Sequence, residues 1–227
     1  SRVLRFIVAL AILTLASGTL GKAAAGDVVL MPDRDALMGT PLVVWGNTNP
    51  LNAGAAYTIN FGDASSTSGT VTDASYIAVN HTYATPGVKT VTMTIGSESD
   101  TATVEVFDGG TLSAENQRNI GINMAIEDGL RFLYVSQQNR QAAYMAGSKF
   151  THWTSFSAIY GPDIEFTTSS TSLIVLAMEN HAHSVTDDPT QDIFQPVVQR
   201  GLNFLFDNLQ TIGLGPQNGN DPCAGLG

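Results

Sequence analysis

Two neighbouring segments alternate strictly between hydroxyl and apolar side chains, and this alternation constrains the fold more than any other feature. In residues 88–95, threonines at every second position alternate with Lys89 and three apolar residues, and residues 101–106 repeat the pattern. Successive side chains of a β-strand point to opposite faces of its sheet. Each segment is therefore predicted to form a strand with one face on an apolar core and the other in water.

The chain before these segments is predicted to hold further short strands separated by turn residues. The candidates are residues 28–30, 41–45 and 56–61, with a strand ending at Tyr83. Residues 65–75 are polar, with Val71 as the only large apolar side chain, and are predicted to form a flexible connection. Several short strands at this spacing favour an antiparallel β-sandwich over residues 27–108.

A set of motifs within this region resembles the PKD (polycystic kidney disease) domain. The pattern comprises an aromatic-x-Phe-Gly-Asp turn, a His-x-Tyr strand end, a Pro-Gly turn and the alternating strand; here it is carried by Tyr57, Ile59, Phe61, Gly62, Asp63, His81, Tyr83, Pro86 and Gly87. The chain departs from the family at Asn60, where Asp is usual, and at Ala64, where Gly usually follows the Asp. The resemblance implies an immunoglobulin-like sandwich that acts as a spacer or contacts proteins or glycans.

Asp63 and His81 allow a structural and a functional interpretation. In the structural one, Phe61 and Tyr83 pack between the sheets, Asp63 accepts backbone N–H groups in its turn, and His81 hydrogen-bonds beside it. In the functional one, Asp63 and His81 bind a metal or ligand, but a carboxylate and an imidazole are too few ligands for a metal site. We therefore predict a structural role. Residues 80–82 (Asn-His-Thr) also fit the glycosylation acceptor pattern.

After the glycines at 109 and 110, residues 109–214 change to helical periodicity. A first helix is predicted from a cap at Ser113 to about residue 138, and a second over residues 171–181, strongly apolar at 173–178. Residues 139–165 are predicted to connect the two. A third helix is predicted over residues 189–209, with Asp188 as N-cap, Pro189 in its first position and a kink or restart at Pro196.

Residues 128–134 (Asp-Gly-Leu-Arg-Phe-Leu-Tyr) align with residues 200–206 (Arg-Gly-Leu-Asn-Phe-Leu-Phe). Gly-x-x-Phe-Leu followed by Gln near the helix end resembles the repeat of squalene cyclases and protein prenyltransferase β-subunits. That resemblance implies helical-hairpin repeats of an α/α toroid, in which residues 173–178 would suit an inner helix. Three helices would make the toroid incomplete, so we expect the N-terminal piece of a longer protein. The alternative is an unrelated helical bundle in which Gly129 and Gly201 allow close helix contact.

The toroid pattern is not matched throughout. Trp153 lies far from Gln137, whereas the family's Gln and Trp are close, Asp128 stands where a basic residue is usual, and Gln210 comes one position late. Terpene cyclases use an Asp-x-Asp-Asp acid, and residues 185–188 (Val-Thr-Asp-Asp) lack its first Asp. No set of residues in this chain matches the zinc ligands of the prenyltransferases.

The two ends of the chain carry different signals. Arg2 and Arg5 precede the apolar residues 6–15, and three alanines end at Ala25, so residues 1–25 are predicted to be a secretory signal peptide. Ten residues at about 1.5 Å each cover half of a ~30 Å hydrocarbon core, so we expect no stable membrane span after cleavage. Residues 215–227 are predicted to be a flexible tail. Its Cys223 is the only cysteine, which excludes an internal disulfide.

No complete catalytic, cofactor-binding or metal-binding constellation is present. His181 and His183 stand near Glu179 and the aspartates at 187 and 188, but residues i and i+2 face different sides of a helix, so a polar helix end is the favoured interpretation. The acidic pairs 127–128 and 163/165 lack a partner base. We predict no catalytic residue, no metal ligand and no cofactor.

The net charge of the chain limits the kinds of partner that it can bind. The chain of 227 residues carries a net charge of −10 with only 13% charged residues, which argues against nucleic acid. The leading hypothesis is a secreted or cell-surface, non-catalytic spacer or binding protein that contacts protein or carbohydrate. The alternatives are the N-terminal fragment of an exported toroid enzyme with its active site beyond residue 227, and a self-assembling envelope protein.

Overall fold

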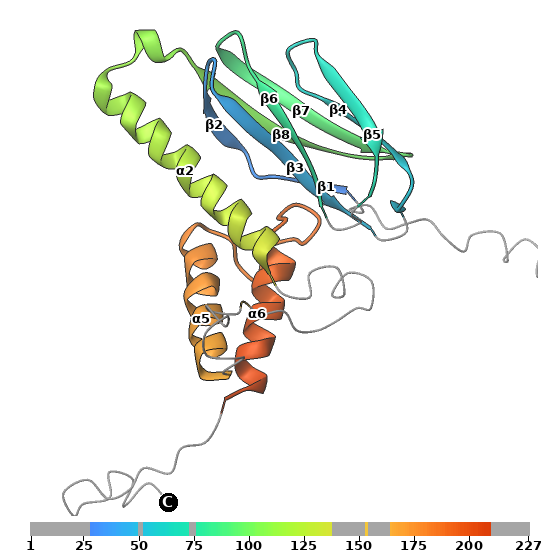
Figure 1. Cartoon of the computed structure of the whole chain (residues 1–227), viewed down its shortest axis with the longest axis vertical. Coiled ribbons are helices and arrows are strands. Elements are labelled where there is room, and N and C mark those ends of the chain that lie inside the picture. The colour runs from blue at the N-terminus through green and yellow to red at the C-terminus, as the bar shows by residue number, and fades with distance from the viewer. Residues whose placement is uncertain (1–27, 50–51, 73–75, 138–152, 154–163, 210–227) are drawn as a thin grey trace, which may run out of the picture. The chain divides into compact units, whose positions relative to one another are not determined.

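The computed structural model describes residues 28–49, 52–72, 76–137, 153 and 164–209 (Figure 1). Two compact units are present: residues 1–121 with 189–193, called the β unit, and residues 122–188 with 194–227, called the helical unit. The boundary falls between Gly121 and Ile122. The predicted signal peptide and tail, Cys223, Asp163 and Gln210 lie outside the described residues.

The β unit contains two sheets. One is antiparallel and runs β1-β3-β6; the other runs β2-β8-β7-β4-β5 (Figure 1). The second sheet is antiparallel except for the parallel pair of β2 with β8. The strands are β1 Val28–Leu30, β2 Arg34–Leu37, β3 Pro41–Thr48, β4 Ala56–Asn60, β5 Ser66–Thr70, β6 Ile77–Thr82, β7 Gly87–Ile95 and β8 Glu98–Phe107.

This strand order is that of an immunoglobulin-like sandwich. The N-terminal strand is divided, since β1 pairs with β3 in one sheet while β2, three residues later, pairs with the last strand β8 in the other. The chain then crosses between the sheets, so that β3 pairs with β6 and β4 with β7. When β1 and β2 are counted as one divided strand, one sheet contains the first, second and fifth strands of the chain. The other contains the third, sixth and last. This is the Greek-key arrangement of the immunoglobulin class.

The predicted alternation is confirmed. Val91, Met93 and Val104 are 0% exposed, and the threonines between them point outward. Val44 on β3 and Ile59 on β4 are equally buried, so residues from both sheets form one core. Burial of each such side chain contributes about 1.5–3 kcal/mol to folding, which makes this layer the main source of stability in the β unit.

Two strands depart from the sequence-based expectation. Residues 65–75 are not simply a flexible connection, because β5 pairs with all five residues of β4. Its polar sequence hid it: β5 has no large apolar side chain, and the Tyr57 ring occupies the space beside Gly69, where an added Cβ would lie 2.6 Å from the Tyr57 hydroxyl oxygen. The short strand β2 was also missed; it contains Arg34 and Asp35 and buries Ala36.

The helical segments are η2 Gly109–Thr111, α2 Ala114–Ser136, α5 Ile164–Asn180 and α6 Gln195–Asp207. The Ser113 cap is confirmed, because its hydroxyl oxygen accepts the Asn116 N–H at 3.2 Å. The second helix begins at Ile164, earlier than predicted. None of the described helices is long and apolar enough to cross a membrane.

The start predicted for the third helix is wrong. Residues 189–194 form turns, and α6 begins at Gln195 with Pro196 in its first turn and Phe194, not Asp188, as its N-cap. The predicted restart at Pro196 is confirmed. Proline has no backbone N–H to donate to a preceding turn, so it is favourable in the first turn of a helix and unfavourable further inside.

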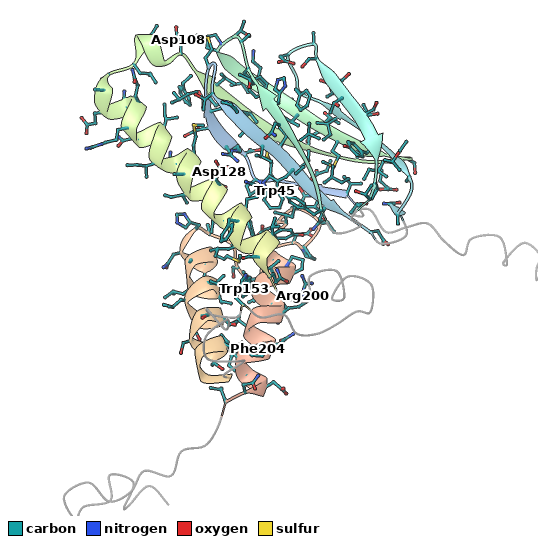
Figure 2. All side chains as sticks on the ribbon, in the orientation of Figure 1. Trp45, Asp108, Asp128, Trp153, Arg200 and Phe204 are labelled. Atoms are coloured by element: carbon teal, nitrogen blue, oxygen red, sulfur yellow. The ribbon has the colours of Figure 1, made fainter. Side chains whose placement is uncertain are left out.

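In the helical unit α5 and α6 lie side by side (Figure 1). The helices approach closely at Gly201, where an added Cβ would lie 2.6 Å from Cγ2 of Val175 and 3.5 Å from the Trp153 ring (Figure 2). The close helix contact that the alternative of an unrelated bundle expects is therefore present at Gly201. Met178 and Phe194 are fully buried in the same unit.

Candidate functional site

The residues of the strongest sequence motif lie together. We call Phe61, Asp63, His81 and Tyr83 the FGD cluster. The rings of Phe61 and His81 are stacked, with centroids 3.9 Å apart and planes 3° from parallel, and Tyr83 meets the His81 ring edge-on at 4.5 Å. The Tyr83 hydroxyl donates to the carbonyl oxygen of Phe61 at 3.0 Å. Phe61 and Tyr83 are both buried, as predicted.

The Asp63 carboxylate holds the turn between β4 and β5. One oxygen, Oδ2, lies 2.8 Å from Nε2 of His81. The other, Oδ1, accepts the backbone N–H of Ser65 at 3.0 Å and its hydroxyl at 2.5 Å. Both predicted interactions, with the turn backbone and with His81, are confirmed. Both oxygens therefore help to hold the turn, Oδ1 through Ser65 and Oδ2 through His81.

The pKa values of the cluster reflect these contacts. Burial by itself raises the pKa of Asp63, but the hydrogen bonds from the Ser65 hydroxyl, from His81 and from the Ser65 backbone outweigh it and lower that pKa to about 2. Burial, together with the negative charge of Asp63, raises the pKa of Tyr83 to about 12. At neutral pH Asp63 is therefore an anion and Tyr83 a neutral phenol, so neither group is suited to exchange protons there.

The backbone of the turn adopts two left-handed conformations. Gly62 has φ +77°, and an added Cβ would lie 2.6 Å from the carbonyl oxygen of Thr90, so only glycine fits. Ala64 has φ +70° without being glycine. It occupies the position where glycine is usual in the PKD-like pattern, and a Cβ there is strained by about 1–2 kcal/mol.

The outer face of the larger sheet carries a broad set of hydroxyl side chains. The strand register aligns Ser68, Thr58, Thr94 and Ser99 in one row across four strands. A second row consists of Ser66, Asn60, Thr92 and Thr101. We call these eight residues with Thr90 and Thr103 the hydroxyl face. Along these alternate positions of β4, β5, β7 and β8, Glu105 is the only ionisable side chain.

His181 and His183 lie at the end of α5. The N–H of His183 donates to Met178 and that of Ala182 to Glu179, both at their carbonyl oxygens, and Ala182 has φ +66°. This is a Schellman motif, which ends the helix. The His183 ring packs on Phe194 at 4.3 Å, and Asp187 accepts the Ser184 N–H. Within the described ranges, no three His, Cys, Asp or Glu side chains are placed to hold a metal ion.

Trp153 lies closer to Gln137 than their separation in sequence suggests. Its indole N–H donates to the carbonyl oxygen of Leu133 at 2.7 Å, one turn before Gln137, and its backbone N–H donates to the Thr171 hydroxyl. Gln137 is buried at the end of α2. Trp153 thus connects α2 to α5 within the helical unit (Figure 2).

The two copies of the helical repeat have opposite environments. Gly201 and Phe204 are buried in α6. In α2, Gly129 is exposed, an added Cβ there would meet nothing within 4 Å, and Phe132 is 66% exposed. The interpretation that both glycines allow close helix contact is therefore wrong for Gly129 within this chain.

Neither a protein family nor a curated protein matches the chain. Among solved structures it is similar to fibronectin(III)-like modules of Clostridium thermocellum CbhA, at TM-score 0.28 and 16% identity, over 35% of this chain and 93% of that one. It is also similar to the D00-D0 domain of Intimin, at TM-score 0.31 and 14% identity, over 40% of this chain and 52% of that one. For domains 4 and 5 of the S-layer protein SbsC the TM-score is 0.26 at 11% identity, over 35% and 50%.

The class that the fold defines is an immunoglobulin-like β-sandwich followed by helices. This class rests on the strand order and on the parallel pair of β2 with β8.

Proposed function

We propose that this chain is a non-catalytic contact or spacer module of a secreted or cell-surface protein, in which a PKD-like sandwich stands before a helical repeat scaffold. One observation carries the proposal: the Asp63 carboxylate is bonded to the His81 imidazole and to its turn, and the Tyr83 phenol to the Phe61 carbonyl. Contacts of this kind hold the strands and the turn of the sandwich together, which supports a structural role for the cluster.

The surface suited to a partner is the hydroxyl face. A hydroxyl group both donates and accepts hydrogen bonds, so a face of aligned Ser and Thr side chains complements the hydroxyls of a neutral glycan or the polar surface of a protein. The chain has 20 acidic residues against 10 basic ones. None of the ten residues of the hydroxyl face is charged, so the face itself adds no repulsion against an anionic polymer.

Binding of the full chain to insoluble neutral polysaccharides and to a glycan array tests this surface. The informative variant replaces Thr58 and Thr94 by Val, which keeps the β-branched shape and removes two hydroxyls from one row. We expect an about tenfold loss of affinity, the equivalent of about 1.4 kcal/mol. The control Thr72→Val changes an exposed threonine outside the face and should bind as the wild type does. Equal binding by all three proteins would assign contact to another surface.

The helical unit is proposed to be a scaffold of hairpin repeats related to the α/α toroid. Its support is the packing of α6 on α5 through Gly201, since the repeat glycine is used there to bring two helices together.

Export is proposed from residues 1–25 and is tested by expressing the chain in a bacterial host. Mass spectrometry of the exported protein should then give an N-terminus at Gly26, and retention of residues 1–25 would contradict the cleavage.

A further inference from the structure

An exposed apolar stripe runs along α2 within the helical unit. Ile122, Ala125, Gly129 and Phe132 follow at steps of three, four and three residues, which places them on one face of a helix. All four are exposed, with Ile122 at 49% and Phe132 at 66%. The buried residues of the same segment, Met124, Leu130 and Tyr134 among them, lie on the opposite face. We call the four exposed residues the α2 stripe.

The same pattern recurs at residues 194–204, at and after the N-cap of α6, where its residues are buried. The repeat alignment pairs each residue of the α2 stripe with a residue that is buried: Ile122 with Phe194, Ala125 with Val197, Gly129 with Gly201 and Phe132 with Phe204. Ile126, which is half-buried, corresponds to the fully buried Val198. The same order of large, small and aromatic residues is thus present twice: it is buried in the second copy and exposed in α2.

The buried copy of the pattern has two neighbours: at Gly201 it packs on α5, and Phe194 packs against Tyr134 of α2 and against His183. Val175 fills the space that Gly201 leaves, and Thr171 lies beside it. The opposite face of α5 is also apolar, because Leu173 and Leu176, one turn apart, are 68% and 53% exposed. Among the described residues, the helical unit therefore exposes the α2 stripe and this second face of α5, besides Phe206 and Leu209 at the end of α6.

We propose that the α2 stripe is the docking surface for α5 of a second copy of this chain. The stripe repeats the residue order that packs on the Val175 face of α5 at Gly201, and Gly129 leaves room for a backbone to approach as closely as at Gly201. A second copy is the occupant because the chain itself carries the matching apolar face, Leu173 and Leu176. Each copy has both surfaces, and the proposed dimer closes by forming the contact twice around a two-fold axis. This inference does not depend on the proposed role of the hydroxyl face.

Charge sets the conditions under which the dimer forms. Each copy carries a net charge of −10, so two copies repel one another at low ionic strength. Salt screens that repulsion over about 10 Å at 0.1 M and leaves apolar contact unaffected. The dimer is therefore expected to become tighter as salt is raised, the reverse of an interface built on opposite charges.

Sedimentation of the full chain over a range of concentrations tests the proposal. The wild type should form dimers, and Phe132→Glu or Leu173→Lys should each weaken dimerisation by about ten- to a hundredfold, as truncation of central apolar residues does in other interfaces. Phe206→Glu is the matched control, because Phe206 is an equally exposed phenylalanine (67%) on α6 outside both surfaces. It should dimerise as the wild type does. Far-ultraviolet circular dichroism confirms that each variant is folded.

Mixing the two variants separates this contact from any other. Phe132→Glu and Leu173→Lys each disturb both contacts of their own dimer. A mixed dimer keeps one wild-type contact and brings Glu opposite a lysine-bearing helix in the other, so mixing should restore dimers. Three results would overturn the proposal: a wild-type monomer at every concentration, dimers unaffected by both substitutions, or no restoration on mixing.

Discussion

Two sequence motifs of this chain differ in how far they determine their own contacts. The FGD cluster of the β unit closes on itself, since each of its polar groups bonds to another member of the motif or to its turn. The Gly-Leu-x-Phe-Leu repeat of the helical unit does not: the glycine and phenylalanine of its second copy are buried in α6, and those of its first are exposed in α2. A motif that contains its own bonding partners determines its role, whereas a repeat specifies only a face and leaves the role to whatever packs there.

Alanine substitution of the repeat phenylalanines should give the largest effect. Phe204→Ala leaves a cavity in the helical unit, and large-to-small changes at such sites cost about 3–5 kcal/mol in the free energy of unfolding. Phe132→Ala removes a side chain that is 66% exposed and should cost less than about 0.5 kcal/mol in the monomer. Denaturant unfolding followed by helical circular dichroism measures both. Equal losses would show that the two copies share one environment.

The repeat glycines should respond with opposite signs. Gly201→Ala forces a Cβ to within 2.6 Å of Val175 and should destabilise the helical unit by about 1–3 kcal/mol. In the monomer, Gly129→Ala meets nothing and improves helix propensity, so it should stabilise by about 0.5–1 kcal/mol. Thermal unfolding at a concentration where the chain is monomeric compares the two. A loss at both positions would mean that the α2 stripe is covered in the monomer, which would also contradict the proposed docking surface.

The sequence predicted those parts of the β unit that are determined by patterns of neighbouring residues. Period-two alternation identified β7 and β8 and their core faces, and the PKD-like motif predicted the contacts of Asp63 and His81. It missed β5 because Ser66–Thr70 carries no apolar alternation, and its strand state comes from pairing with β4 and from the Tyr57 ring beside Gly69. Pairing between segments is a long-range property that a local pattern does not contain.

The helical unit shows the same limit in another form. The Ser113 cap and the restart at Pro196 were predictable, because both depend on one or two neighbouring residues. The choice of Asp188 and Pro189 as a helix start failed since the same residue types also form turns. Which copy of the repeat is buried depends on α5, a separate segment, and no residue within the repeat specifies it.

Lowering the pH tests how much the hydrogen bonds of Asp63 in the FGD cluster contribute to stability. The pKa of Asp63 is lowered to about 2 in the folded state from 3.8, so its contribution to stability is complete above about pH 5 and is lost as the pH falls through 2. Its size is about 1–2 kcal/mol. The difference in unfolding free energy between wild type and Asp63→Asn should therefore shrink from pH 5 towards pH 2. A difference that stays constant over this interval would show that the bonds to Ser65 and His81 do not stabilise the charged form.

The smallest effect concerns the one residue of the closed motif that does not suit its conformation. Ala64 has φ +70°, where a Cβ is strained and glycine is not, so Ala64→Gly should stabilise the β unit by about 0.5–1 kcal/mol after the entropy cost of glycine in the unfolded chain. Ala84→Gly is the matched control, an exposed loop alanine without a positive φ, and it should destabilise by about 0.4–1 kcal/mol. Both are measured by denaturant unfolding. Stabilisation by Ala64→Gly alone would mean that the PKD-like turn geometry persists despite the departure from the family's glycine, because the contacts of Asp63 hold the backbone in place. Destabilisation at both positions would mean that the turn has relaxed around its alanine, and the motif would then be less self-sufficient than its hydrogen bonds indicate.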